Sequence, residues 1–183
     1  MRNKTIANRK VKRFSIFLLL AALLFSCGKE KKKPIYYDMS SLSEATSYAK
    51  SGEEIVIPFR YENGVKYVTV KVNGVGFEMI FDTGCSGALI SLAEADYLYQ
   101  KGTLTRDDIL GFAQATIADG SVVENMVVNL KEVIIDDKIL CPNVTATVSK
   151  NINAPLLLGN EILDRLATIT IDNENKTLNF KIK

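Results

Sequence analysis

The stretch Met79-Ile80-Phe81-Asp82-Thr83-Gly84-Cys85-Ser86 joins an apolar run to a carboxylate, a hydroxyl and a glycine. No glycine or proline separates the apolar residues from Asp82, so the pattern predicts a buried strand that ends at this aspartate. A carboxylate at the end of a buried strand is held rigidly and partly desolvated, which suits it to acid–base chemistry. We expect the Thr83 hydroxyl to hydrogen-bond across the turn. Gly84 should take up a backbone conformation that other residues resist and allow close approach of a ligand.

Strand and hairpin signals lead into this stretch. Residues 55–57 begin a strand, and Glu62-Asn63-Gly64 predicts a hairpin turn. Residues 67–72 alternate with the period of a half-buried strand. Asn73-Gly74 predicts a type I′ turn, because that turn needs positive φ at both central residues. Residues 77–81 then form the strand that reaches Asp82.

Further short strands and two small helices follow the motif. Ser91 and Glu94 form a capping-box pattern that predicts a helix through about Gln100, and Thr105 predicts the start of a second helix at residues 106–110. Turns are expected at Asp119-Gly120, Asp136-Asp137 and 172–175, and strands at 88–90, 114–118, 122–133, 134–135, 138–140, 144–148, 168–171 and 177–182. Residues 156–159 are a short apolar run that ends in glycine, and residues 162–166 have helical spacing. This pattern predicts an all-β fold, a small closed β-barrel with one or two short helices.

The first 26 residues have the features of an export signal. Six basic residues precede an apolar run at 14–25, which is too short for a membrane-spanning helix. The end of the run, Leu24-Phe25-Ser26-Cys27, resembles the lipobox of bacterial lipoproteins, which implies cleavage before Cys27 and lipidation of its thiol. The alternative is an unmodified thiol after an uncleaved anchor. Either way we expect a protein held at a bacterial membrane in the cell envelope, facing the periplasm or the exterior.

Residues 27–52 are charged and poor in core residues, and we expect a flexible tether there. A short helix at 41–50, closed by Gly52 as a left-handed cap, is possible within it. The folded domain is expected at 53–183. From Ser51 to Lys183 the chain has 12 lysine and arginine residues against 18 aspartate and glutamate residues, a net charge of −6. This acidic balance predicts no nucleic-acid partner.

Residue types that are missing narrow the chemistry. The sequence has no histidine, which excludes a Ser-His or Cys-His catalytic pair and a histidine-based zinc site, and we expect neither a metal nor a cofactor. Apart from Cys27, the cysteines are Cys85 and Cys141. They could form a disulfide in an oxidising compartment, but their apolar surroundings favour two buried thiols.

The stretch around Asp82 resembles the active-site segment of retropepsin-like aspartic proteases. Residues 116–120 resemble the flap of the bacterial single-domain members, and Leu157-Leu158-Gly159 resembles the segment that threads beside the active-site loop. The resemblance implies a retropepsin-like barrel with Asp82 as the catalytic residue and Thr83 and Gly84 as its turn. It also implies that Asp119 and Gly120 lie near the flap tip over the substrate, although an exposed hairpin turn is an equal alternative for these two. Cys85 departs from the family pattern, which has alanine there, and the segment between motif and flap is longer than in retroviral enzymes.

The implied activity is hydrolysis of a peptide or protein substrate by two aspartates that share a proton. Since the chain has one Asp-Thr-Gly, such a site requires a homodimer in which two copies of Asp82 meet on a two-fold axis. Two alternatives stay open. The chain could be an inactive lipoprotein that keeps the fold as a peptide- or protein-binding module. It could also be a structural β-domain in which the tripeptide occurs by coincidence.

Overall fold

The structure, a computed structural model, describes residues 46–47, 52–117 and 119–183. The leader at 1–26, Cys27 and nearly all of the expected tether lie outside these residues. The predicted helix at 41–50 is wrong for the two of its residues that are described, because Thr46–Ser47 form strand β1, which pairs with Leu140 and Ile139. In the ranges described, no helix has the length and apolar character needed to cross a bilayer.

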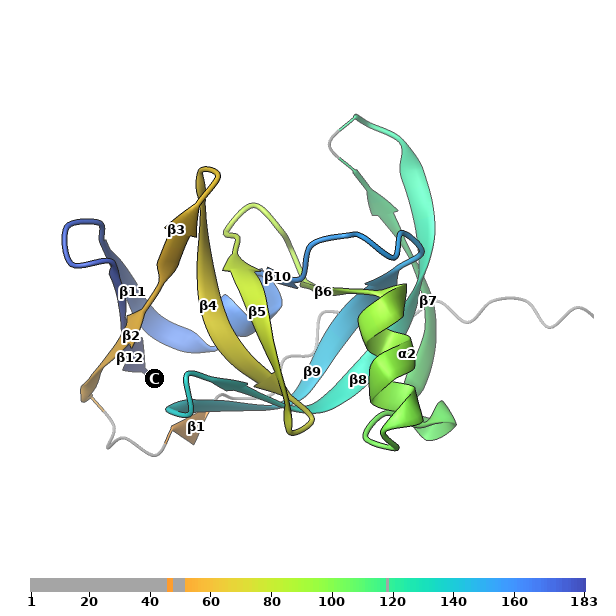
Figure 1. The fold of residues 1–183 in the computed structure, drawn as a ribbon, viewed down its shortest axis with the longest axis horizontal. Coiled ribbons are helices and arrows are strands. Elements are labelled where there is room, and N and C mark those ends of the chain that lie inside the picture. The colour runs from red at the N-terminus through yellow and green to blue at the C-terminus, as the bar shows by residue number, and fades with distance from the viewer. Residues whose placement is uncertain (1–45, 48–51, 118) are drawn as a thin grey trace, which may run out of the picture. The chain divides into compact units, whose positions relative to one another are not determined.

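Six strands pair in a closed ring that accounts for most of the fold (Figure 1). In order around the ring they are β4 (Val65–Val72), β5 (Val75–Phe81), β10 (Leu157–Leu158), β6 (Ala88–Ser91), β9 (Ile139–Ser149) and β8 (Val122–Ile135). The ring closes because β8 pairs with both β9 and β4. The predicted all-β, barrel-like fold with two short helices is therefore confirmed, as a ring of paired strands.

Alternating side chains explain why the ring has an apolar interior. In β4, Val68, Val70 and Val72 are buried, while Thr69 and Lys71 between them are exposed. This is the period-two pattern expected from the sequence. Residues from β6, β8, β9 and β10 contribute to the same continuous core.

Turn residues fix the pairing of the strands. Asn73 and Gly74 have φ values of 47° and 80°, as a type I′ hairpin turn requires. Asp136 and Asp137, between β8 and β9, have φ values of 47° and 55°. The Asn73 side chain also binds neighbouring segments, donating to the Thr103 carbonyl (2.9 Å) and accepting from the backbone N–H of Glu132 (3.2 Å). The predicted turns are confirmed.

The helices start where the capping residues predicted. Helix α2 (Leu92–Gln100) is capped by Ser91, whose hydroxyl accepts from the backbone N–H of Ala93 (3.0 Å), and Glu94 completes the capping box. The second predicted helix is shorter than expected. It is a single 3-10 turn, η1 (Arg106–Asp108).

Three strands are longer than their sequence patterns predicted. Strand β7 (Ile109–Thr116) begins five residues before the expected start at 114, β8 runs unbroken through 122–135, and β9 continues across Cys141, Pro142 and Asn143. Strand β8 provides partners for the other two, since it pairs with β7 on one side and β9 on the other. Asn143, the residue after Pro142, has a φ of 49°, and the register of β9 against β8 is the same before and after it.

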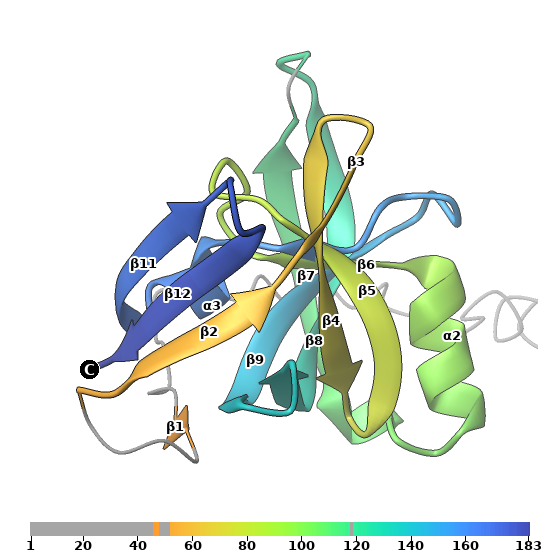
Figure 2. The ribbon, with the colours of Figure 1, turned by 60° about the vertical axis from the view of Figure 1, so that its left-hand side comes forward.

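A separate three-stranded sheet contains the C-terminus (Figure 2). Its order is β11 (Leu166–Asp172), β12 (Thr177–Ile182) and β2 (Glu54–Pro58), all antiparallel. The short strand β3 (Arg60–Glu62) follows β2 and joins the ring by pairing with β4. Helix α3 (Asn160–Leu163) connects β10 to this sheet, and Leu166, expected to be helical, starts β11 instead.

Candidate active site

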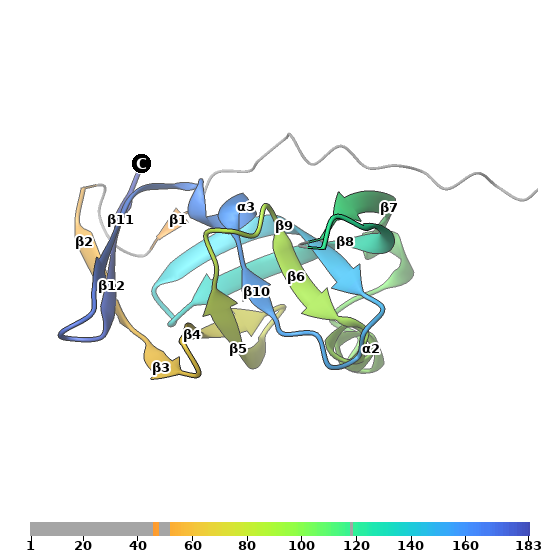
Figure 3. The same cartoon turned by 90° about the horizontal axis from the view of Figure 1, so that it is seen from above.

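Asp82 follows directly on the last residue of β5. Its backbone N–H donates to the Leu158 carbonyl (3.1 Å), and the side chain is half-buried. Strand β10 lies between β5 and β6 (Figure 3), parallel to β5 with Leu158 opposite Phe81, and antiparallel to β6. The strand-end position predicted for Asp82 is confirmed, and residues 157–159 thread beside its loop as the resemblance implied.

The turn after Asp82 is hydrogen-bonded to the carboxylate and the carbonyl of this residue. The backbone N–H of Gly84 donates to Asp82 Oδ1 (2.9 Å), and that of Cys85 donates to the Asp82 carbonyl (3.3 Å). Thr83 and Gly84 are exposed. Within the described part of the chain, the Thr83 hydroxyl has no hydrogen-bond partner, so the predicted bond across the turn is not formed within one copy.

The unusual backbone conformation expected of Gly84 is wrong, whereas the room expected for a close approach is present. Gly84 has no left-handed backbone, so a special φ value does not require it. A Cβ atom there would lie 3.2 Å from Asp82 Oδ1, a closer approach than side-chain carbons usually make. Glycine therefore leaves room beside the carboxylate.

Residues of helix α3 donate hydrogen bonds to the loop that follows Asp82. The Asn160 side-chain amide donates to the Thr83 carbonyl (3.1 Å), while the backbone N–H groups of Asn160 and Glu161 donate to the carbonyls of Cys85 (2.9 Å) and Ser86 (3.1 Å). These bonds fix the loop at three of its carbonyl groups. Sequence reasoning missed Asn160, because nothing in the sequence shows that it lies next to a turn 77 residues earlier.

Gly159, just before α3, has no room for a side chain. A Cβ atom would lie 2.1 Å from the Gly87 carbonyl oxygen and 2.6 Å from that of Cys85. Both contacts are with backbone, which cannot rotate away. Gly159 therefore packs closely against the backbone of the loop that follows Asp82.

The hairpin between β7 and β8 contains Asp119 and Gly120. It projects beyond the ring on the same side as the loop that follows β5 (Figures 1 and 2). Gly120 has a φ of 85°, and Asp119 accepts from the backbone N–H of Ser121 (2.8 Å). Hydrogen bonds from Ser121 lower the pKa of Asp119. These two residues lie at an exposed hairpin tip, and their role over a substrate stays a prediction.

A protein-family model described as "gag-polyprotein putative aspartyl protease" matches residues 68–165, from β4 to just past α3. The match covers more than half of the chain and contains Asp82, its turn and the segment that binds the turn. The chain belongs to this aspartyl protease family. A search of curated proteins found no match.

Two solved structures are similar to this chain. The retropepsin-like aspartic protease from Rickettsia conorii is 20% identical, with 77% of this chain and 97% of that chain covered and a TM-score of 0.50. The retroviral protease-like domain of Ddi1 from Leishmania major is 14% identical, with 66% and 93% covered and a TM-score of 0.40. The first similarity supports a retropepsin-like fold.

Cys85 places a thiol beside the aspartate of this aspartyl protease family member. Its Sγ lies 3.1 Å from the Gly87 carbonyl oxygen, to which it donates. Burial raises the pKa of the Cys85 thiol, and the charge of Asp82 adds to the effect. Cys85 is therefore protonated at neutral pH. Cys85 and Cys141 are both free, so the disulfide considered between them is not formed.

A buried ion pair ties α3 to β9. Arg165 and Glu161 are 3% and 4% exposed and contact each other through Arg165 Nη2 and Glu161 Oε1. Arg165 also donates to the carbonyls of Pro142 (2.6 Å) and Asn143 (3.2 Å). The sequence analysis did not single out this pair, although charges four residues apart within the apolar stretch at 159–166 were a usable signal.

Burial raises the pKa of Glu161, and the nearby Arg165 charge only partly opposes this. Its second carboxylate oxygen is buried and, among the residues described, has no hydrogen-bond partner. A raised pKa in the folded state means that this group's contribution to stability is complete below its ordinary pKa of 4.5 and is lost as the pH rises through the folded value.

We therefore expect the free energy of unfolding of the wild type to fall, relative to that of Glu161→Gln, as the pH rises from about 4 to 8. Urea unfolding of both proteins across this range measures the difference. Glu174→Gln, which removes a carboxylate from an exposed turn, is the control. A wild type that gains stability over Glu161→Gln with rising pH would show that the ion pair outweighs burial.

Proposed function

We propose that this protein is an aspartic endopeptidase that hydrolyses peptide bonds with Asp82 as its catalytic residue. The observation that carries the proposal is the half-buried Asp82 carboxylate at the end of β5, on a turn fixed from behind by Asn160 and by β10. Membership of an aspartyl protease family supports the same chemistry. The two exposed residues after Asp82 leave one side of the carboxylate open to a substrate or a second chain.

The reaction needs two carboxylates that share one proton, because like charges so close together cannot both ionise. One carboxylate takes a proton from a water held between them, and that water attacks the scissile carbonyl carbon. The protonated carboxyl group donates a hydrogen bond to the carbonyl oxygen as negative charge develops there.

The second carboxylate comes from a second copy of the chain in this proposal. Asp119 lies at an exposed hairpin tip, and Asp172 accepts hydrogen bonds from Glu174 and Asn175 in its own turn. Neither turn places its aspartate beside Asp82. Two copies of Asp82 on a two-fold axis complete the pair, with each exposed Thr83 hydroxyl available to the partner turn.

Asp119 and Gly120 would then act at the tip of a flap. The hairpin they close can lie over a bound peptide and exclude water from the carboxylate pair. Gly84, with no side chain beside Asp82, leaves the room that a substrate carbonyl needs.

The location proposed is the cell envelope, with the domain tethered to a membrane by a lipid on Cys27. The basic head, apolar run and cysteine of the leader support this assignment. Tethering raises the local concentration of the domain and so favours the dimer.

Cleavage of a peptide library in the presence and absence of pepstatin tests the proposed activity. We expect cleavage of internal peptide bonds that pepstatin inhibits and that metal chelators leave unchanged. Saturable peptide binding without any cleavage would favour the alternative, an inactive peptide-binding module with the same fold.

A further inference from the structure

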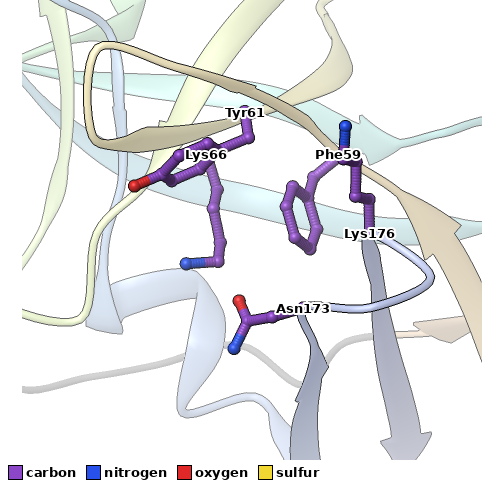
Figure 4. A pocket seen from close by; sticks show the side chains of 5 residues that line it. All are labelled: Phe59, Tyr61, Lys66, Asn173 and Lys176. Atoms are coloured by element: carbon purple, nitrogen blue, oxygen red, sulfur yellow. The ribbon is translucent and has the colours of Figure 1, made fainter.

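A pocket of about 270 Å³ lies between the β3–β4 hairpin and the turn that joins β11 to β12 (Figure 4). Its lining residues are Phe59, Tyr61, Lys66, Asn173 and Lys176. Phe59, only 6% exposed, provides an apolar floor, whereas the other four offer polar groups around it. Asp82 and its turn do not line this pocket, so the proposed catalytic chemistry does not account for it.

The walls of the pocket are held in place by contacts outside it. Arg60 binds Glu78 through two nitrogen atoms (3.1 and 2.8 Å) and also pairs with Glu62, which fixes β3 against its neighbours. Asp172 accepts three hydrogen bonds within the β11–β12 turn (3.0, 2.9 and 2.7 Å). A backbone hydrogen bond from Phe59 to the carbonyl of Lys176 (2.9 Å) joins the two walls. A ligand would therefore meet a largely preformed site.

The two charged side chains that line the pocket are both lysines, in a domain that is acidic overall. Lys66 and Lys176 form no ion pair with any described residue. Glu62 and Glu78 pair with Arg60, Asp172 accepts hydrogen bonds within its own turn, and none of these three carboxylates lines the pocket. The exposed Glu174 belongs to the same turn but does not line the pocket.

The Lys66 ammonium lies close to both aromatic rings of the pocket. Lys66 Nζ lies 5.5 Å from the ring centroids of both Phe59 and Tyr61, which is within the range of cation–π attraction. In the view of Figure 4 the Lys66 ammonium points toward the Asn173 side chain, and Lys176 lies on the other side of Phe59. An ammonium and an amide donate hydrogen bonds to an oxyanion, and the rings contact apolar groups.

We propose that this pocket binds a ligand in which an oxyanion, a carboxylate or a phosphate, is attached to an aromatic or aliphatic group. Lys66 and Asn173 bind the oxyanion directly, and Lys176 adds attraction from a longer distance. Phe59 and Tyr61 contact the apolar part. This site is separate from Asp82 and does not depend on the proposed protease activity.

Isothermal titration calorimetry of the full chain tests the site with four probes: phenyl phosphate, phenylacetate, inorganic phosphate and benzyl alcohol. We expect phenyl phosphate or phenylacetate to bind saturably, and inorganic phosphate and benzyl alcohol to bind more weakly than the tighter of the two. Lys66→Gln should weaken that binding by about 10-fold or more, because it removes a charged donor. Lys176→Gln should weaken it by only about 2- to 5-fold.

Lys71→Gln is the matched control, because Lys71 lies on the same strand as Lys66 but pairs with Asp137 (2.6 Å). It should leave the Kd unchanged, and Lys66→Arg should retain binding. If phenylacetate binds more tightly, the charged group of the preferred ligand is a carboxylate. If phenyl phosphate binds more tightly, that group is a phosphate. Equal binding of benzyl alcohol, equal binding of inorganic phosphate, no saturable binding of either aromatic anion, or an unchanged Kd in Lys66→Gln would each overturn the proposal.

Discussion

Asp82→Asn is expected to lower kcat for peptide cleavage by about 1000-fold or more, because the amide can neither take a proton from water nor share one with a second carboxylate. In a dimer of this variant both halves of the site are lost. Asparagine has nearly the same size, and Asp82 Oδ1, which accepts from Gly84, remains an oxygen. Turnover of a fluorogenic peptide measures the effect, and circular dichroism verifies the fold.

The matched control for this variant is Asp96→Asn, which changes an exposed carboxylate on α2 that accepts from Gln100 (2.6 Å). We expect it to cleave at the wild-type rate. If Asp82→Asn kept wild-type turnover and pepstatin still inhibited it, the catalytic assignment of Asp82 would be wrong.

Gly159→Ala is expected to destabilise the domain by about 3 kcal/mol or more, at the upper end of what overpacking costs. The added methyl carbon would lie 2.1 Å from the Gly87 carbonyl oxygen, so β10 and the Asp82 loop must move apart. That movement would disturb the bonds from α3 that hold the loop. A fall in Tm of about 10 °C or more should accompany it.

Gly76→Ala is the control for Gly159→Ala. Gly76 lies in β5, and a Cβ atom there would meet no atom within 4 Å. Its Tm should stay within about 2 °C of the wild type. Equal melting temperatures for Gly159→Ala and Gly76→Ala would contradict the packing described for β10.

Local signals were sufficient for much of the fold. Asn73-Gly74 and Asp136-Asp137 predicted their turns because positive φ is a property of few residue types, and Ser91 predicted the start of α2 through its own hydroxyl. The lengths of the strands were harder to predict from the sequence. The continuous course of β9 past Pro142 depends on its pairing with β8, which local propensity does not include.

The same distinction between local and long-range determinants applies to the candidate site. The position of Asp82 at a strand end followed from the apolar residues before it. The bond from Asn160 to Thr83 and the pocket around Lys66 join segments that are far apart in the sequence, so no local pattern could reveal them. For Gly84 the expected close approach agrees with the space beside Asp82, but the expected unusual backbone conformation was wrong, because the φ value depends on the folded turn.

The most direct test of the central claim, that two copies of Asp82 form one site, combines sedimentation with activity. The unit of residues 34–183, which omits the leader, is suited to it. We expect this unit to sediment as a dimer at high concentration, and cleavage per chain to fall on dilution in step with the loss of dimer. A species that sediments as a monomer and cleaves peptides with pepstatin sensitivity would contradict it.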